Sequence, residues 1–275
     1  MFVTALYEMN KKTQPSLDKD ESGGVRAVER AADILTSLGK AERSLSEISR
    51  DVSLNKATVF RMLVSLERKG FVFKDVNTGK YSLDWRLLGL FSNMLTRSQG
   101  LVNNAYPYME RLWKLTGETI TLYIKKGLDR LCVAELPSSQ PLKYTAGVGM
   151  TVPLHAGSPG KLLLAFMPPE ELSKSLEQIE LFRLTHKTII NRDVLIKELL
   201  LIQEQGWSTS FGERIDGVSS LSVPVYNREK KVEASLNILG PFVRLGEKSL
   251  MNYLEILQDA ALDLSNRLGY YENRD

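Results

Sequence analysis

The amino-acid sequence predicts an α+β protein with an N-terminal winged helix-turn-helix, a linker helix and a C-terminal domain built on an antiparallel sheet with flanking helices. Three observations predict this class. Two short amphipathic segments with helix-start signals meet at a tight turn near Ser53. A run of alternating residues typical of a hairpin follows at 71–83. After Gly117, apolar strand-like runs joined by short turns alternate with helical patterns.

The composition is that of a globular protein without membrane segments. Hydrophobic residues make up 43% of the 275 residues and charged residues 25%, which suits two packed domains. No apolar run approaches the roughly 20 residues that span a bilayer, and the N-terminus lacks the features of a signal peptide. The single cysteine, Cys132, excludes an internal disulfide and fits a reducing compartment. We therefore expect a cytoplasmic protein with no membrane partner.

Basic residues are concentrated in the first part of the chain. The stretch 25–98 holds 13 basic and 8 acidic residues, whereas 99–275 holds 20 basic and 21 acidic ones. Positive charge at one domain favours attraction to a nucleic-acid backbone. Because the excess is modest, pairing of two subunits would help to make binding firm. The polar stretch 1–24 is predicted to be a flexible tail.

The predicted winged domain, 25–83, begins with a helix at 25–38. Ser44 and Glu47 form a capping box that starts a second helix, and Asn55 is a favoured N-cap for a third. Gly70 ends this third helix. The inward positions expected for the first helix are Val28, Ala31, Leu35 and Leu38, and those of the third are Val59, Met62, Leu63 and Leu66.

The polar face of the third helix predicts contact with DNA. Asn and Arg side chains can read adenine and guanine edges, Ala and the Thr methyl group can contact thymine, and Lys can pair with phosphate. The residues of this face are Asn55, Lys56, Ala57, Thr58 and Arg61. Further contacts with the phosphate backbone are expected from Arg26, Ser44, Lys74 and Lys80, although Arg26 reads equally well as a solvated arginine. An ordinary small helical bundle with a solvated basic face is the alternative interpretation.

A linker helix is predicted at 84–98 and a separate helix at 101–115, where the second domain, 99–275, begins. The linker is apolar around much of its circumference, so it needs a partner, which could be its own domain or a second subunit. Its apolar residues are Trp85, Leu87, Leu88, Phe91, Met94 and Leu95. Strands are expected at 118–125, 131–136, 218–225 and 232–239, and helices at 161–165, 169–177, 193–205 and 247–268.

Several of these motifs resemble the IclR-type bacterial transcriptional regulators. The motifs are the runs from Arg26 to Leu35, Leu45 to Ile48, Asn55 to Leu63, Pro153 to Ala165 and Gly206 to Val225, in the order and spacing of that family. The resemblance covers 25–270. It implies a six-stranded, GAF-like antiparallel sheet, an effector site in the second domain, and a homodimer or dimer of dimers paired through the linker helix.

The segment before the helix at 161–165 is the candidate effector site. The small residues of His155-Ala-Gly-Ser-Pro-Gly160 bring backbone amides to a helix start, which favours an anion such as a small carboxylate. The resemblance implies that effector contacts come from Ala156, Gly157, Ser158, Ser210, Ser220 and Asn237. Ser210 with Phe211 replaces a frequent acidic residue, and Asn237 with Leu239 replaces small hydroxyls. The identity of the effector therefore stays open.

Two motifs in the same segment suggest chemistry that the rest of the chain does not support. Ala156 to Gly160 approaches the nucleophile elbow of serine hydrolases, but His186 is the only later histidine and the strand–helix alternation of that fold is missing. Gly157 to Lys161 lacks the first glycine and the Ser or Thr of a phosphate loop. One cysteine and two distant histidines give no metal cluster. We expect no catalytic residues, no metal and no cofactor.

The sequence thus predicts a transcriptional regulator whose affinity for double-stranded operator DNA is controlled by a small organic acid, with repression as the favoured outcome. An alternative is a ligand sensor that acts through contacts with other proteins and uses its winged domain as a docking module. A salt-insensitive protein that does not bind DNA would favour that alternative.

Overall fold

The computed structural model describes residues 25–39 and 41–271, with only the backbone described for 90–99. The predicted tail, 1–24, lies outside the described residues. The chain divides into two compact units, one that ends at Ser98 and one that begins at Gln99. Each unit is built around its own core, so each is described by itself.

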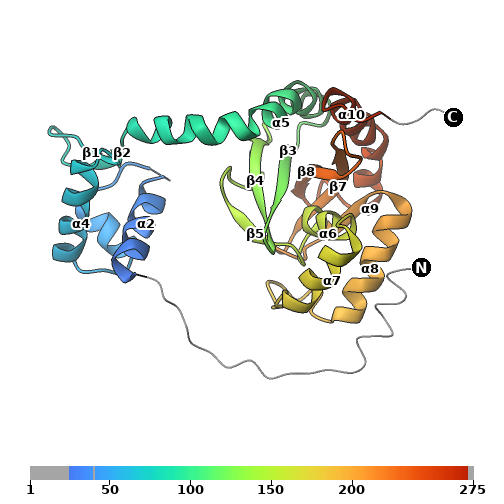
Figure 1. The fold of residues 1–275 in the computed structure, drawn as a ribbon, viewed down its shortest axis with the longest axis horizontal. Helices are drawn as coiled ribbons and strands as arrows, with labels where there is room; N and C mark the ends of the chain where they lie inside the picture. Colours follow the sequence, from blue (N-terminus) through green and yellow to red (C-terminus); the bar gives the residue numbers. More distant parts are fainter. Residues whose placement is uncertain (1–24, 40, 272–275) are drawn as a thin grey trace. The chain divides into compact units, whose positions relative to one another are not determined.

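The first unit is a winged helix-turn-helix (Figure 1). Its elements are α2 (Arg26–Leu38), α3 (Leu45–Asp51), α4 (Lys56–Arg68), β1 (Val72–Lys74) and β2 (Tyr81–Leu83). The predicted capping box is confirmed, because the Ser44 hydroxyl and backbone N–H both donate to the Glu47 carboxylate. The predicted wing is also confirmed, since β1 and β2 pair antiparallel with Val72 opposite Leu83.

The core of this unit differs from the prediction at one helix. Val28, expected to point inward, is 67% exposed, whereas Ile34 is fully buried. The period of 3.6 residues places Ile34, Leu38 and Ala31 on one face of α2 and turns Val28 toward its edge, where no element of this unit covers it. The stripe of α4 is as predicted, with Val59 and Leu63 buried. The buried residues of the cluster are Ile34, Leu38, Ile48, Val59, Leu63, Val72 and Tyr81.

A single helix, α5 (Arg86–Thr116), replaces the two helices that the sequence analysis expects at 84–98 and 101–115. Gly100 alone weakens a helix by only about 1 kcal/mol, which the packing of the following turns offsets. These turns bury Leu101, Ala105, Met109 and Leu112, and Pro107 is accommodated within the helix. Trp85 and Leu88 are exposed, and the side chains of Phe91, Met94 and Leu95 lie outside the described part.

The second unit contains a six-stranded antiparallel sheet, which confirms the expected architecture. The strands are β3 (Thr119–Lys126), β4 (Asp129–Leu136), β5 (Thr151–Pro153), β6 (Ser208–Phe211), β7 (Val218–Tyr226) and β8 (Val232–Pro241), in the order β5-β4-β3-β8-β7-β6. Four of them were predicted from the sequence. The other two, β5 and β6, are short edge strands of three and four residues, too short for a pattern of alternation to reveal.

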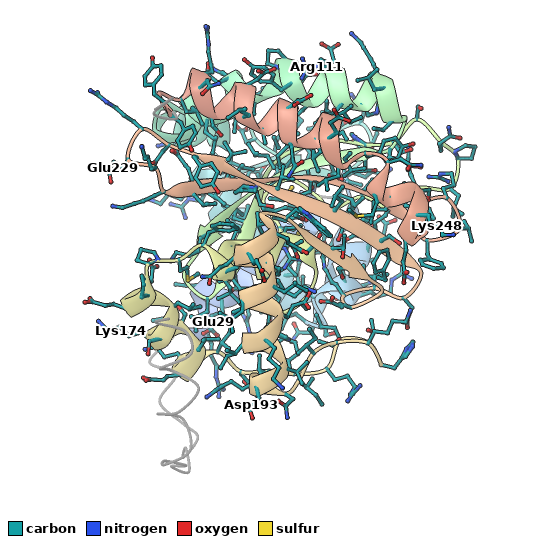
Figure 2. All side chains as sticks on the ribbon, turned by 90° about the vertical axis from the view of Figure 1, so that its right-hand side faces the viewer. Glu29, Arg111, Lys174, Asp193, Glu229 and Lys248 are labelled. Carbon is teal, nitrogen blue, oxygen red and sulfur yellow. The ribbon has the colours of Figure 1, made fainter. Side chains whose placement is uncertain are left out.

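The two faces of this sheet differ in chemistry. One face carries Leu122, Leu236 and Ile238 and packs against the C-terminal half of α5 and against α10 (Leu254–Arg267). The opposite face carries hydroxyl and amide side chains and lies under α6 (Ser158–Ala165), which contacts β7 and β8. The polar residues of this face include Thr121, Ser220, Ser222, Ser235 and Asn237. Figure 2 shows the sheet edge-on between its two helical layers.

The remaining helices complete the layer on the α6 side and the end of the chain. They are α7 (Pro169–Gln178), α8 (Arg192–Gln205) and α9 (Glu247–Met251). Helix α8 packs directly on α6, and the two share a buried apolar cluster with α7. The single helix predicted at 247–268 is divided into α9 and α10 at Asn252 and Tyr253. No helix among the described residues is long and apolar enough to cross a membrane.

Candidate DNA-binding and effector sites

The exposed face of α4 presents most of the side chains predicted to read DNA. Lys56, Ala57 and Arg61 are exposed, and Thr58 is partly buried at the first turn. Arg61 stands on the face opposite the buried Val59 and Leu63, so its guanidinium can reach a groove edge. Phe60, which the prediction omitted, is 46% exposed beside this face. An aromatic residue out of phase with the buried stripe was the signal that could have revealed it.

Two predicted DNA contacts already have structural roles. The Asn55 side-chain oxygen accepts a hydrogen bond from the Thr58 backbone N–H at 2.8 Å and caps α4. The Ser44 hydroxyl donates to Glu47 at 2.7 Å within the capping box of α3. Both residues position a helix start, and base reading by Asn55 would compete with its capping bond.

The remaining basic candidates lie at the start of α2 and on the wing. Arg26 is exposed at the first position of α2. The Lys74 ammonium lies 5.5 Å from the centre of the Tyr81 ring, and the Lys80 ammonium lies 3.5 Å from a Glu42 carboxylate oxygen. Both lysines are partly exposed, so these contacts contribute little to stability and leave both cations available to a phosphate.

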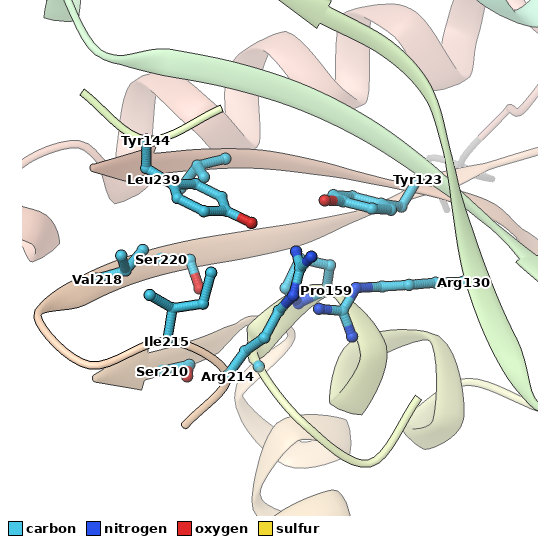
Figure 3. Close-up of a pocket in the computed structure, with 11 residues that line it drawn as sticks. Tyr123, Arg130, Tyr144, Pro159, Ser210, Arg214, Ile215, Val218, Ser220 and Leu239 are labelled. Carbon is cyan, nitrogen blue, oxygen red and sulfur yellow. The ribbon is translucent and has the colours of Figure 1, made fainter. Parts of the chain in front are cut away.

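A pocket in the second unit opens between the polar face of the sheet and the segment that follows β6 (Figure 3). About 400 Å³ of space lies between its protein atoms, a volume that includes open solvent at its mouth. Four residues bring charge or a phenol group, namely Tyr123, Arg130, Tyr144 and Arg214. The other lining residues are Gly157, Pro159, Ser210, Ile215, Val218, Ser220 and Leu239.

Arg130 is the most buried charged group of this pocket. Its side chain is 2% exposed, and its Nη1 donates to the carbonyl oxygens of Pro153 and Ala156 at 2.8 and 2.6 Å. Its Nε has no hydrogen-bond partner among the described residues. Burial, with a smaller contribution from the charge of Arg214, lowers the pKa of Arg130 to about 10, so it stays charged at neutral pH.

The glycines of the Gly157-Ser-Pro-Gly160 motif make room for this arginine. A Cβ atom on Gly160 would lie 2.5 Å from Arg130 Nη1 and would also clash with the Leu154 carbonyl oxygen. A Cβ atom on Gly157 would lie 3.2 Å from Nη2, and the φ of +86° at Gly157 is itself strained for any other residue. The motif therefore houses a buried guanidinium, a role that sequence reasoning had not assigned.

Each arginine of the pocket lies against the ring of a tyrosine. The Arg130 guanidinium carbon is 5.2 Å from the centre of the Tyr123 ring, and that of Arg214 is 5.8 Å from the centre of the Tyr144 ring. Figure 3 shows the two phenol oxygens pointing toward each other across the pocket, with the Arg214 guanidinium beneath them. The pocket is thus strongly cationic, which suits an anion.

The start of α6 is less available to an anion than expected. The Gly157 N–H donates to a Glu213 carboxylate oxygen at 3.0 Å, so an internal carboxylate already occupies part of this helix terminus. The other Glu213 oxygen lies 2.5 Å from the Lys161 ammonium, which also binds Glu198 at 2.8 Å. Part of this helix start is therefore occupied from within the protein, and the cationic groups that line the pocket are Arg130 and Arg214.

Three of the six predicted effector residues line the pocket, namely Gly157, Ser210 and Ser220. Ser222 donates to Ser158 at 2.7 Å, and Ser158 donates to Ser220 at 2.6 Å, which leaves the Ser220 hydroxyl proton free to donate to a ligand.

Ala156, Ser158 and Asn237 lie outside the lining. The Ala156 carbonyl oxygen accepts a hydrogen bond from Arg130. The Ser158 hydroxyl is already hydrogen-bonded to its serine partners. The Asn237 amide donates to the Thr121 carbonyl oxygen at 3.0 Å, which ties β8 to β3, and to the Ser235 carbonyl oxygen of its own strand at 2.9 Å. Direct contact of these three side chains with an effector is not supported by this geometry.

Sequence reasoning missed all four charged or phenolic residues of the pocket. Arg130 had a usable signal, since it occupies an inward position of β4, in phase with the buried Cys132. A charged residue at such a position is costly unless it serves a partner. Tyr144 and Arg214 lie in segments without periodicity, and only the tertiary structure brings them to β3 and β4.

The remaining metal-ligating and nucleophilic side chains of histidine and cysteine are His155, His186 and Cys132. The described residues contain no group of three or more His, Cys, Asp and Glu side chains that could hold a metal ion. His155 is buried, and its Nε2 lies 3.0 Å from the Phe182 carbonyl oxygen, as expected of a structural histidine. Burial raises the pKa of the Cys132 thiol to about 12, which keeps it neutral and unreactive.

Comparison with known proteins finds one family along most of the chain. The model of the IclR helix-turn-helix domain matches residues 27–75, and that of the C-terminal domain of the bacterial transcriptional regulator IclR matches residues 94–266. The HTH-type transcriptional regulator KdgR of Dickeya chrysanthemi is 32% identical over 257 residues, which cover 93% of this chain and 84% of KdgR.

Two further proteins extend this similarity. The HTH-type transcriptional repressor AllR of Escherichia coli strain K12 is 31% identical over 250 residues, which cover 90% of this chain and 91% of AllR. The crystal structure of the Thermotoga maritima IclR has a TM-score of 0.74 at 28% identity and covers 89% of this chain and 99% of that one. The similarity therefore includes both units.

Proposed function

Because the chain belongs to the IclR family of bacterial transcriptional regulators, we propose that it represses transcription from an operator and that a small organic acid in the Arg130–Arg214 pocket controls its affinity for that operator. The regulatory role and the two-domain division of labour follow from the family. Repression is proposed from the similarity to AllR, a repressor. The cytoplasmic location stays a prediction.

The observation that carries the effector assignment is the cationic pocket. Two guanidinium groups, two phenol groups and a serine hydroxyl converge on one small cavity in the domain that does not hold the helix-turn-helix. A carboxylate would gain charge-assisted hydrogen bonds from these groups. To regulate, the acid must bind the DNA-competent and DNA-incompetent arrangements with different affinity.

Operator reading is proposed for Lys56, Ala57, Thr58 and Arg61, with Arg26, Lys74 and Lys80 on phosphates. Arg26, Lys56, Ala57 and Arg61 are exposed, and the other three side chains, Thr58, Lys74 and Lys80, are partly exposed. In helix-turn-helix proteins the first turns of the recognition helix lie against base edges, and α4 corresponds to that helix.

We also propose that the regulator works as a homodimer or a dimer of dimers on a pseudo-palindromic operator. Two features support pairing: the modest basic excess of one winged domain, and the exposure of Trp85 at 84% and Leu88 at 57% around the start of α5. Light scattering of the full chain, with and without DNA, measures the number of subunits; a monomer on DNA would contradict this part.

Fluorescence anisotropy with DNA selected from a random pool tests the whole function. The selected DNA should bind orders of magnitude more tightly than scrambled DNA, with a steep dependence on salt concentration. An added acid should shift the curve for the selected DNA. Equal, weak and salt-insensitive binding of both DNAs would contradict the proposal and favour a winged domain that docks onto another protein.

A further inference from the structure

We propose that the effector is an organic acid with two carboxylate groups, one for each of two arginine–tyrosine pairs in the pocket. The proposal rests on the function proposed above, because it concerns the ligand of the same pocket. The inner pair is Arg130 with Tyr123, and the outer pair is Arg214 with Tyr144 (Figure 3).

Within the described part of the chain, neither guanidinium has a neutralising carboxylate partner. Among the described residues, no ion pair joins Arg130 or Arg214 to a carboxylate. Two carboxylates on neighbouring segments are already in use. Glu135 accepts hydrogen bonds from the Ala146 and Gly147 backbone N–H groups, and Glu213 accepts them from Gly157 and Lys161. The ligand-free pocket therefore holds two positive charges that repel each other.

The two charges lie at different depths, which favours two separate acid groups. Arg130 is 2% exposed and is fixed by two carbonyl oxygens, whereas Arg214 is half-buried in the segment after β6. A buried charge is costly unless it is paired. One carboxylate would neutralise one positive charge and leave the pocket with a net charge of +1. A dianion would neutralise both.

Each pair also offers a neutral hydrogen-bond donor beside its cation. Burial raises the pKa of Tyr123 to about 12 and raises that of Tyr144 above its ordinary value, so both phenols keep their protons at neutral pH. Each phenol O–H can then donate to a carboxylate held by its arginine. The tyrosine backbones are fixed as well, since Tyr123 lies in β3 and the Tyr144 carbonyl accepts from Thr119 at 2.7 Å.

The space between the two pairs suits a short carbon chain. Pro159, Ile215, Val218 and Leu239 supply apolar lining, while the Ser220 hydroxyl at the end of its serine relay can donate to a substituent on the chain. The expected ligand is therefore a short aliphatic diacid.

The test uses the full chain and matched pairs of acids at constant ionic strength. Succinate, glutarate and adipate are compared with their monomethyl esters, which keep the carbon chain and lose one charge. Isothermal titration calorimetry should show at least one diacid that binds about tenfold or more tightly than its half-ester, equivalent to roughly 1.4 kcal/mol. Equal affinity within all three pairs, or no binding by any of the acids, would overturn the proposal.

Arg214→Gln tests the outer half-site. The preference for the diacid should fall to about threefold or less, by loss of diacid affinity and not by gain of half-ester affinity. Arg214→Lys should retain part of the preference, because the charge stays. Arg228→Gln, a control at an exposed arginine on the β7–β8 connection, should retain all of it. An unchanged preference in Arg214→Gln would also overturn the proposal.

A ligand-independent measurement accompanies the titration. Since Arg214 and Arg130 repel each other, Arg214→Gln should raise the melting temperature of the ligand-free protein while it reduces the stabilisation by a diacid. The proposed function and the diacid inference can be contradicted independently of each other. A monoacid that binds and shifts operator affinity would overturn only the proposal that the effector is a diacid. A diacid that binds without any effect on operator affinity would overturn only the proposal that the pocket regulates DNA binding.

Discussion

At the scale of single residues, Arg61 is the side chain expected to carry base specificity. It is exposed on the outer face of α4, and no ion pair holds its guanidinium among the described residues. Arg61→Ala should weaken binding to the selected operator by about 1–3 kcal/mol and relax specificity at one base position. Anisotropy against operators mutated at each position measures both effects.

Lys74→Ala tests a phosphate contact, in contrast to the base contact tested by Arg61→Ala. Arg228→Ala is the neutral control. A phosphate contact by Lys74 predicts uniform weakening across sequences and a salt slope smaller by about one. Arg228 lies in the other unit and should leave DNA binding unchanged. Equal losses on all operators in Arg61→Ala would show that Arg61 contacts phosphate and not a base.

The capping box at Ser44 makes a second prediction at this scale, for pH. Hydrogen bonds from the Ser44 hydroxyl and backbone N–H lower the pKa of Glu47 below its ordinary value in the folded state. The stabilisation is therefore present above the unfolded pKa and is lost as the pH falls through the folded pKa. Glu47→Gln should flatten the loss of stability of the winged domain between about pH 7 and about pH 3.

Carbon-13 NMR of the Glu47 carboxyl group measures this pKa directly, and urea unfolding at each pH measures the stability. Glu67→Gln on α4 is the matched control, since Glu67 is exposed and its side chain has no hydrogen bond or ion pair among the described residues. A Glu47 that titrates at or above its unfolded pKa would contradict the prediction.

Prediction from sequence succeeded where local chemistry decides the structure. Ser44 and Asn55 were identified as caps because a capping side chain needs only its own next three residues. The pocket residues Arg214 and Tyr144 were missed because their contact depends on the segment after β6 and the loop at 137–150 coming together. Serines on the polar sheet face were placed only in part, since register decides whether a hydroxyl faces a ligand or another serine.

At the scale of elements, the first turn of α6 should be sensitive to a single added methyl group, which is expected to lower the stability of the fold. Gly160 lies inside a helix, where Gly→Ala usually stabilises by about 0.5–1 kcal/mol. Here the added methyl group would press against Arg130 and the Leu154 carbonyl, and overpacking of this kind costs about 1–3 kcal/mol or more. Gly160→Ala should therefore lower the melting temperature.

Gly100→Ala is the control for this prediction. Gly100 is exposed on α5, and a Cβ atom there would meet nothing within 4 Å, so the substitution should stabilise slightly. Differential scanning calorimetry of both variants measures the difference. If Gly160→Ala were as stable as Gly100→Ala, Arg130 would not occupy the space behind the glycine motif.

The two faces of the second unit's sheet have different roles. Its apolar face packs against α5 and α10 and forms the hydrophobic core. Its polar face contacts α6 and contributes to the pocket. Strand periodicity predicted the apolar face well, because burial of alternating residues is a strong signal. The continuity of α5 could not be predicted, because Gly100 and Pro107 weaken a helix locally and only tertiary packing offsets them.

At the scale of the whole molecule, the proposed regulation has a thermodynamic consequence that needs no knowledge of its path. If an acid in the pocket changes operator affinity by some factor, operator DNA must change the affinity for that acid by the same factor. Typical couplings of about 1–3 kcal/mol correspond to about 5–150-fold. Repression with release by the acid predicts a factor below one in both directions.

Four titrations close the cycle: operator binding with and without saturating acid by anisotropy, and acid binding with and without saturating operator by calorimetry. The two ratios should agree within error, and scrambled DNA at the same concentration should leave the affinity for the acid unchanged. A ratio of one on both sides would show that the acid binds without regulating, because a ligand with equal affinity for two states shifts neither. A ratio above one would make the acid a co-repressor, in which case the two arginine–tyrosine pairs stabilise the DNA-competent arrangement instead of opposing it.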